Sequence, residues 1–235
     1  MFKRIAVYFS LLALFSPQIF FCSVAFAGVK AVDVKPLKLD TAGGFLVLDS
    51  LRIRAESLPG AEGIALSIYE GSELAVRVNH DKKYPYLGDA WYFDLDGNGL
   101  KDFVICASYM GNGLPQDEVI LLFQAQPGKF RRIDYSTYGF KIGDFRDFDG
   151  DGKYEAVISS LLRSAASLDG KEHSYWVYAV YRIEKLDLKM ANGLAAGYPK
   201  FNWFTEKPNS KETKKLSPVQ KAEYIASLPS VIASS

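Results

Sequence analysis

Two stretches of the chain repeat one acidic pattern, and this repetition constrains the fold more than any other feature of the sequence. Residues 94–105 read DLDGNGLKDFVI, and residues 147–158 read DFDGDGKYEAVI. Both stretches place acidic or amide side chains at alternate positions, set two glycines between them and end in a short apolar run. An apolar, β-branched run that follows glycine-rich sequence indicates a β-strand. The repetition therefore predicts two copies of one unit in which a loop leads into a strand.

Each acidic loop has the spacing of oxygen ligands that wrap a calcium ion. If the first aspartate is position 1, an EF-hand loop supplies oxygens at positions 1, 3, 5, 7 (a backbone carbonyl) and 9, with glycine at position 6 for a sharp turn. Gly99 and Gly152 occupy position 6. The predicted ligands of one ion are Asp94, Asp96, Asn98, Leu100 and Asp102, and those of a second ion are Asp147, Asp149, Asp151, Lys153 and Glu155.

Calcium suits these loops better than other divalent ions. Close carboxylates repel one another when ionised, and a hard cation relieves that repulsion. Magnesium prefers a tight octahedron, and zinc prefers the His and Cys ligands that the loops lack. Position 12, a bidentate glutamate in an EF-hand, is Ile105 in one loop and Ile158 in the other, so we expect a weak affinity of about 10⁻⁴ to 10⁻³ M. The alternative interpretation is two solvated Asp-Gly turns.

The remaining sequence is typical of short β-strands. Runs rich in β-branched and aromatic residues alternate with Gly, Pro or Ser, and several show a two-residue period. The predicted strands cover 44–49, 51–54, 63–69, 73–78, 102–108, 118–124, 130–135, 154–161, 174–183 and 186–190. The two acidic motifs begin 53 residues apart, a spacing that fits a unit of four short strands. Clear units therefore span about 88–140 and 141–190, and residues 44–78 are a degenerate first unit without an acidic loop.

The motif D-x-D-G-[ND]-G-x-x-[DE], followed by an apolar strand, resembles the FG-GAP/VCBS-type repeat of integrin-like β-propellers. In that family the loop joins the first two strands of a blade and holds calcium, so the resemblance implies the same ligands as above. The Phe-Gly and Gly-Ala-Pro signatures of the family are not present. Propellers commonly need about four to eight blades to close. We therefore expect a mainly β fold, a partial or open β-propeller-like array of two to three antiparallel four-stranded units, unless copies of the chain associate to cover the open ends.

Residues 1–27 have the pattern of a secretion signal. Lys3 and Arg4 precede a long apolar stretch, and Ala25-Phe26-Ala27 matches the small-x-small site of signal peptidase. Pro17 inside the stretch argues against the alternative of a membrane-spanning anchor. The expected location is therefore outside the cytosol, periplasmic or secreted, with no membrane span after cleavage.

The rest of the chain divides into a β-repeat domain over residues 28–204 and a tail over residues 205–235. The tail begins with a polar, Lys-rich linker, and Ser217-Pro218 then has the pattern of a helix start, which predicts a short C-terminal helix. Removal of residues 1–27 lowers the formal charge from +1 to −1. Because nucleic-acid binding needs a concentrated cationic surface, no nucleic-acid partner is expected.

Catalytic candidates are few. His80 and His173 stand in loop or strand-edge sequence, and neither forms a recognisable pair with a nucleophile. Cys106 lies within an apolar strand, which favours a buried and inert thiol. The carboxylates that could transfer protons are those assigned to calcium. No catalytic residue is therefore predicted.

Aromatic residues favour binding as the function. Their number exceeds what one small core easily buries, although the aromatic residues on alternating strands suit a sheet core. The residues considered are Trp91, Tyr92, Tyr135, Tyr138, Tyr175, Trp176 and Trp203, with loops expected at Tyr84-Pro85-Tyr86 and at 135–140 as the better surface candidates. The favoured function is an exported, non-catalytic module for an unknown protein or glycan partner, with two calcium ions as structural staples. The alternatives are an extracytoplasmic hydrolase or its accessory subunit, and a structural envelope component.

Overall fold

The computed structural model describes residues 30–39, 42–58, 64–79, 86–109, 116–166, 172–194, 198, 202–205, 219 and 232–234. The predicted signal and all of the predicted C-terminal helix except Val219 lie outside these residues. Nearly every described element is a strand, and the short 3-10 turn η1 (Ile142–Asp144) is an exception. No helix within the described ranges is long and apolar enough to cross a membrane. The predicted mainly β fold is confirmed.

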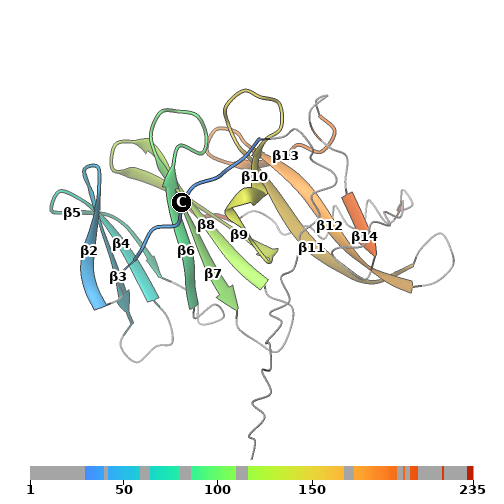
Figure 1. The fold of residues 1–235 in the computed structure, drawn as a ribbon, viewed down its shortest axis with the longest axis horizontal. Helices are drawn as coiled ribbons and strands as arrows, with labels where there is room; N and C mark the ends of the chain where they lie inside the picture. Colours follow the sequence, from blue (N-terminus) through green and yellow to red (C-terminus); the bar gives the residue numbers. More distant parts are fainter. Residues whose placement is uncertain are drawn as a thin grey trace, which may run out of the picture.

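The strands form three antiparallel sheets that follow one another in chain order (Figure 1). Each sheet contains a meander of four consecutive strands. The first sheet holds β2 (Ala42–Leu48), β3 (Leu51–Ser57), β4 (Ile64–Glu70) and β5 (Glu73–Asn79); the second holds β6 (Tyr86–Phe93), β7 (Asp102–Tyr109), β8 (Gln116–Gln126) and β9 (Lys129–Tyr138); the third holds β10 (Phe145–Asp147), β11 (Glu155–Ala166), β12 (Glu172–Ile183) and β13 (Leu188–Met190). Ten of these twelve strands overlap strands predicted from the sequence, whereas β6 and β10, which precede the acidic loops, have no counterpart among the predicted ranges.

Three further strands come from segments outside the meanders. β1 (Lys30–Ala31) pairs with β10, β14 (Asn202–Thr205) pairs with β12, and β15 (Ile232–Ser234) pairs with β9. Both ends of the described chain are therefore joined to sheets. The sequence did not predict these strands, because segments of two to four residues carry too little periodicity to be recognised.

The middle sheet is buried on both faces, and this burial holds the three sheets together. Phe103 and Ile105 of β7 pack with Ile53 and Ile68 of the first sheet. The alternate residue Val104 packs instead with residues of the third sheet, including Ile158. Because successive side chains of a strand point to opposite faces, β7 and β8 can supply apolar residues to both cores. The sheets therefore pack face to face in the order first, second, third.

The aromatic residues of the middle and third sheets mostly belong to these cores. Trp91, Tyr135 and Trp176 are each about 5% exposed. The expectation of a surface loop at 135–140 is wrong for Tyr135 to Tyr138, because these residues continue β9 and alternate in burial. Tyr84 and Pro85 lie outside the described residues, and the expectation of a loop is wrong for Tyr86, which begins β6 and pairs with Ser108. Trp91, Tyr135 and Trp176 are therefore buried in the sheet packing, and the surface interpretation is wrong for them.

Candidate functional site

The two acidic loops occupy equivalent places in the second and third sheets. The first loop joins β6 to β7, the second joins β10 to β11, and both lie along the same edge of the molecule (Figure 1). The loops are in direct contact, since the Tyr154 N–H donates to the Leu95 carbonyl at 3.2 Å. In the first sheet, the short turn at Asp49 and Ser50 joins β2 to β3 in place of such a loop.

Both loops have one hydrogen-bonding pattern. The N–H groups of positions 4 and 6 donate to the two carboxylate oxygens of position 1. The N–H of position 5 donates to position 3, that of position 7 to position 5, and that of position 2 to position 9. The donor–acceptor distances are 2.7–3.1 Å in the first loop and 2.6–3.2 Å in the second. The sequence repeat is therefore a repeat of backbone geometry.

Glycine is required at positions 4 and 6 by backbone conformation. Gly97 and Gly99 have φ values of 73° and 85°, and Gly150 and Gly152 have values of 82° and 86°. This left-handed region strains residues that carry a Cβ. At Gly99, Gly150 and Gly152 a Cβ would meet no neighbouring atom within 4 Å, so the φ angle and not the available space accounts for glycine there.

The aspartates of each loop converge tightly enough for one cation. One carboxylate oxygen from each of Asp94, Asp96 and Asp102 lies within 4.8 Å of the others, and the same holds for Asp147, Asp149 and Asp151. Calcium binds oxygens at about 2.3–2.6 Å, so oxygens that share one ion lie at most about 5 Å apart. Both clusters meet this limit, and their all-oxygen composition suits a hard cation.

Position 9 of the first loop is a buried carboxylate. Asp102 has no exposed surface, and its two oxygens accept the backbone N–H groups of Leu95 and Gln124 at 2.9 and 2.8 Å. Burial raises the pKa of Asp102 to about 7, although these two N–H groups oppose the rise. Burial also raises the pKa of Asp96. A cation beside the cluster would favour the ionised forms of both groups.

Position 9 of the second loop has a different environment. Glu155 is outside the tight cluster of three aspartates. Its Oε2 accepts the N–H of Phe148, and its Oε1 accepts the hydroxyl of Tyr198 at 2.9 Å. The same hydroxyl lies 3.1 Å from Oδ2 of Asp149. A phenol has one proton and can donate to one of these oxygens at a time, so a cation would relieve the remaining repulsion between the oxygens.

Tyr198 was not identified from the sequence. It follows β13 in a segment without a periodic pattern, 43 residues beyond Glu155 in the chain. Its ring stacks on Phe148 with a centroid distance of 6.2 Å. An aromatic residue after the last strand of a unit is too common a feature to mark a contact with an acidic loop.

The remaining predicted ligands lie in the loops at the expected positions. The Asn98 side chain accepts the Leu100 N–H through Oδ1 and donates through Nδ2 to the Gln124 carbonyl at 3.1 Å. The Nζ of Lys153 lies 3.6 Å from Oδ2 of Asp151, as an exposed ion pair. Leu100 and Lys153 are predicted to contribute backbone carbonyls, and a side-chain cation at position 7 competes with a metal ion for the adjacent carboxylate.

The residues considered for catalysis do not form a nucleophilic site in the described part of the chain. Cys106 is 7% exposed, and burial raises the pKa of its thiol to about 12. A thiol with this pKa is not ionised at neutral pH. His173 lies in β12 opposite Ala165, and His80 lies outside the described residues. The prediction of a buried and inert Cys106 is confirmed with respect to burial.

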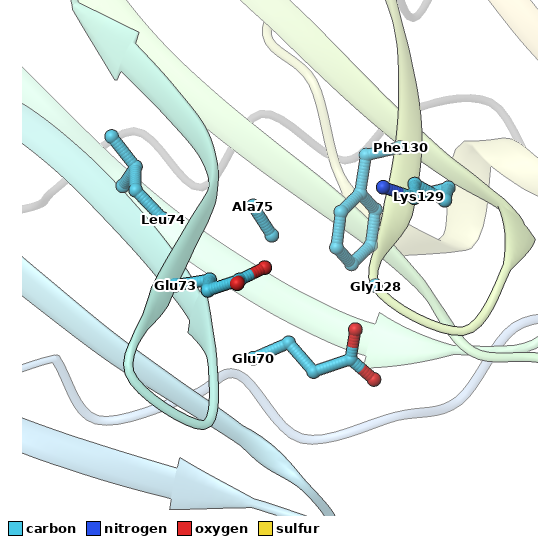
Figure 2. Close-up of a pocket in the computed structure, with 7 residues that line it drawn as sticks. All are labelled: Glu70, Glu73, Leu74, Ala75, Gly128, Lys129 and Phe130. Atoms are coloured by element: carbon cyan, nitrogen blue, oxygen red, sulfur yellow. The ribbon is translucent and has the colours of Figure 1, made fainter.

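A small pocket lies between the β4–β5 turn and the β8–β9 turn (Figure 2). Its volume is about 180 Å³, and it is lined by Glu70, Glu73, Leu74, Ala75, Gly128, Lys129 and Phe130. Glu70 and Glu73 are direct cross-strand neighbours, an arrangement of like charges that is unfavourable. Lys129 brings an opposite charge from the second sheet. The pocket is therefore a polar junction between the first two sheets, and Gln124 links it to the first acidic loop, because its Oε1 accepts the Gly128 N–H and its own N–H donates to Asp102.

Comparison of the chain with family models, with curated proteins and with solved structures finds no match.

Proposed function

We propose that this chain is an exported, calcium-stabilised β-repeat protein that acts by binding a protein or glycan partner and not by catalysis. The observation that carries the proposal is the exact recurrence of one loop geometry, with the same hydrogen bonds and left-handed glycines, around two converging sets of carboxylates. Solvated turns need no such convergence of acidic side chains. Export is supported by the signal pattern of residues 1–27.

The architecture supports a repeat of the propeller-blade type. Three meanders of four antiparallel strands pack face to face, and the acidic loop joins the first two strands of the second and third meanders, as in the FG-GAP/VCBS-type repeat. Calcium would then hold the strand–loop–strand corner of two blades. Asp94, Asp96, Asn98 and Asp102 would hold one ion with the Leu100 carbonyl, and the equivalent second-loop residues would hold another.

Thermal unfolding tests the metal proposal. A ligand at 100 times its dissociation constant stabilises a protein by about 2.7 kcal/mol, which corresponds to roughly 5–11 °C for a chain of this size. With the expected dissociation constant of about 10⁻⁴ to 10⁻³ M, that condition requires about 10–100 mM calcium, which should raise the melting temperature by this amount for each bound ion relative to chelator. Asp96→Ala and Asp149→Ala should each remove part of the shift, and the exposed Asp33→Ala should leave it unchanged. No shift in the unmodified protein, or a full shift in the variants, would contradict the assignment.

A further inference from the structure

The first sheet has a face that does not contact the second sheet. Ile53 and Ile68 point into the shared core, so their strand neighbours Arg54 and Ser67 lie on the opposite face. We call this opposite face the outer face. It carries Phe45, Val47, Arg52, Arg54, Tyr69 and Leu74. Large apolar residues on it are unusually accessible: Phe45 is 43% exposed, Val47 63% and Leu74 52%.

Arginine side chains on this face stack on an aromatic ring. The guanidinium carbon of Arg52 lies 4.3 Å from the centroid of Phe45, and that of Arg54 lies 5.8 Å from it. Glu56 pairs with Arg77 at 2.8 Å and with Arg54 at 3.6 Å. In the described part of the chain, no carboxylate forms an ion pair with Arg52. The outer face therefore presents an exposed guanidinium that is oriented by a ring and that no carboxylate of the described residues neutralises.

The stacked guanidinium lies beside a free strand edge. β2 is an end strand of the first sheet, and no described strand pairs with its outer side. The strand reads AGGFLVL, without charge or proline, and its bulge lies before Phe45. From Phe45 to Leu48, β2 therefore lacks the charges, prolines and bulges that protect edge strands from pairing with another chain. Because Phe45 belongs to β2, the guanidinium of Arg52 lies above the edge strand itself, within reach of an added strand about 4.8 Å away.

We propose that β2 and the outer face of the first sheet bind an extended acidic segment of a partner protein by strand addition. The backbone of the segment pairs with β2, its carboxylates meet Arg52 and Arg54, and its alternate apolar side chains lie near the half-buried Leu46 and Leu48. Strand addition combines main-chain hydrogen bonds with side-chain selectivity in this way. The inference rests on the proposed role as an interaction module, but not on calcium, because the acidic loops are not part of this surface.

The charge of the surface argues against a second copy of the chain as the occupant. A two-fold contact brings the same patch of both copies together, so a face-to-face dimer through this surface would gather the arginines of both copies, which is costly. A glycan can hydrogen-bond to single backbone groups of β2 but cannot form the regular ladder of an added strand, and it has no aliphatic side chains to pack on Val47 and Leu74. An acidic peptide strand satisfies the guanidinium, the aliphatic residues and the strand edge together.

Peptide binding by the full chain tests the proposal. The probe is the labelled peptide acetyl-Val-Glu-Val-Glu-Val-Glu-Val-amide, whose anisotropy is titrated against the protein in calcium and in chelator. The matched peptides are the same sequence with Lys in place of Glu, and the acidic sequence with N-methyl groups at alternate residues. We expect binding of the acidic peptide only, and Arg52→Glu should weaken it about tenfold or more and create binding of the Lys peptide.

Two controls make a negative result informative. Arg131→Glu makes the same charge change on an exposed residue of β9 and should leave peptide affinity within about twofold. Val47→Glu places a negative charge opposite Arg52 without altering a buried residue and should weaken binding of the acidic peptide. Equal binding by Arg52→Glu, equal loss in Arg131→Glu, or no binding at about 1 mM overturns the proposal.

Other occupants give distinct results. Sedimentation analysis would overturn the assignment to a partner protein if it showed a dimer that Arg52→Glu dissociates. Binding of polygalacturonate that depends on Arg52, without binding of the peptide, would overturn it as well. The calcium shift of the melting temperature is measured on the same samples. Its absence would contradict the metal proposal and leave the peptide result unaffected.

Discussion

The two acidic loops share one backbone geometry but differ in what surrounds their last carboxylate. In the first loop, Asp102 is fully buried and is held by two backbone N–H groups, one of them from β8. In the second loop, one backbone N–H and the hydroxyl of Tyr198 bind Glu155. Its neighbours Asp149 and Asp151 are exposed. Both position-9 carboxylates are buried, Asp102 at 0% and Glu155 at 3% exposure, but Asp96 of the first cluster is half-buried where Asp149 of the second is exposed.

This contrast separates two roles that a position-9 carboxylate can have. A buried acceptor of backbone N–H groups is needed for folding whether or not a metal ion binds. A carboxylate that shares one phenolic proton with its neighbour is less constrained by the fold and responds more to a cation. We therefore expect the first loop to affect stability most, and the second loop to show the larger effects of side-chain changes on metal binding.

The largest effect is expected from removal of the position-9 carboxylates in the presence of chelator. Asp102→Ala leaves the N–H groups of Leu95 and Gln124 buried without an acceptor, which should lower the free energy of unfolding by about 3–5 kcal/mol. Glu155→Ala leaves one such group, at Phe148, and should cost about 1–3 kcal/mol. Urea unfolding measures both. A cost for Glu155→Ala equal to or above that for Asp102→Ala would refute the contrast.

The fold and the loop geometry could be predicted from the sequence for a physical reason. Apolar runs and two-residue alternation are local signals: β7 carries a continuous apolar run, Phe103 to Ala107, and β9 alternates in burial. Loop positions 1 to 9 follow from spacing, because the N–H groups and carboxylates that bind each other are at most seven residues apart.

The partners contributed by distant segments could not be predicted in this way. The N–H of Gln124 that binds Asp102 and the hydroxyl of Tyr198 that binds Glu155 come from 22 and 43 residues further along the chain. Each depends on how sheet strands and later segments are placed in space. The difference in exposure between Asp96 and Asp149 is likewise set by tertiary packing and not by the repeated motif.

The second-largest effect is expected from pH in the metal-free protein. The pKa of Asp102 is raised by burial to about 7 in the folded state, above its value in the unfolded chain. A raised carboxyl pKa gives stability that is complete below the unfolded pKa and is lost as pH rises through the folded pKa. In chelator, the free energy of unfolding should therefore fall by about 2–4 kcal/mol between pH 5 and pH 8.

Substitutions at position 9 and added calcium identify the carboxyl group that causes this pH dependence. Asp102→Asn should remove most of it, whereas Glu155→Gln should remove less, and calcium should suppress it because a cation favours the ionised carboxylate. Asp144, whose pKa burial raises to about 6, provides a background in all variants. An unchanged pH profile in Asp102→Asn would show that this carboxyl is not the responsible group.

A smaller effect is expected at Tyr198. Tyr198→Phe keeps the ring that stacks on Phe148 and removes the hydroxyl that reaches Glu155 and Asp149. In chelator this should cost about 0.5–1.5 kcal/mol, and less in calcium, because the ion takes over neutralisation of the carboxylates. The calcium-induced rise of the melting temperature should therefore be larger in Tyr198→Phe than in the unmodified protein.

The control for this change is Tyr154→Phe, which alters a half-buried tyrosine adjacent to the second loop whose ring packs against Phe93. It should leave the calcium-induced shift unaltered. A smaller shift in Tyr198→Phe would mean that the hydroxyl supports the metal-bound geometry, which would reverse the role assigned to it here.

The smallest effect is expected from position 7, where the loops differ by one charge. Lys153 is 53% exposed and lies 3.6 Å from a carboxylate oxygen of Asp151, and an exposed pair of this kind is worth about 0–1 kcal/mol. Lys153→Leu copies Leu100 of the first loop and removes the competing cation. In an Asp96→Ala background, which isolates the second loop, calorimetry should show about two- to fivefold tighter calcium binding.

Lys101→Leu in the Asp149→Ala background makes the same chemical change beside the first loop. Lys101 is 50% exposed, but its partner is Asp49 of the β2–β3 turn, at 3.2 Å, and not a carboxylate of the cluster. Its loss should therefore leave the affinity of the first loop for calcium within error. If both substitutions tighten binding equally, the effect comes from net charge near the edge of the molecule, and the local competition at Asp151 that distinguishes the second loop is refuted.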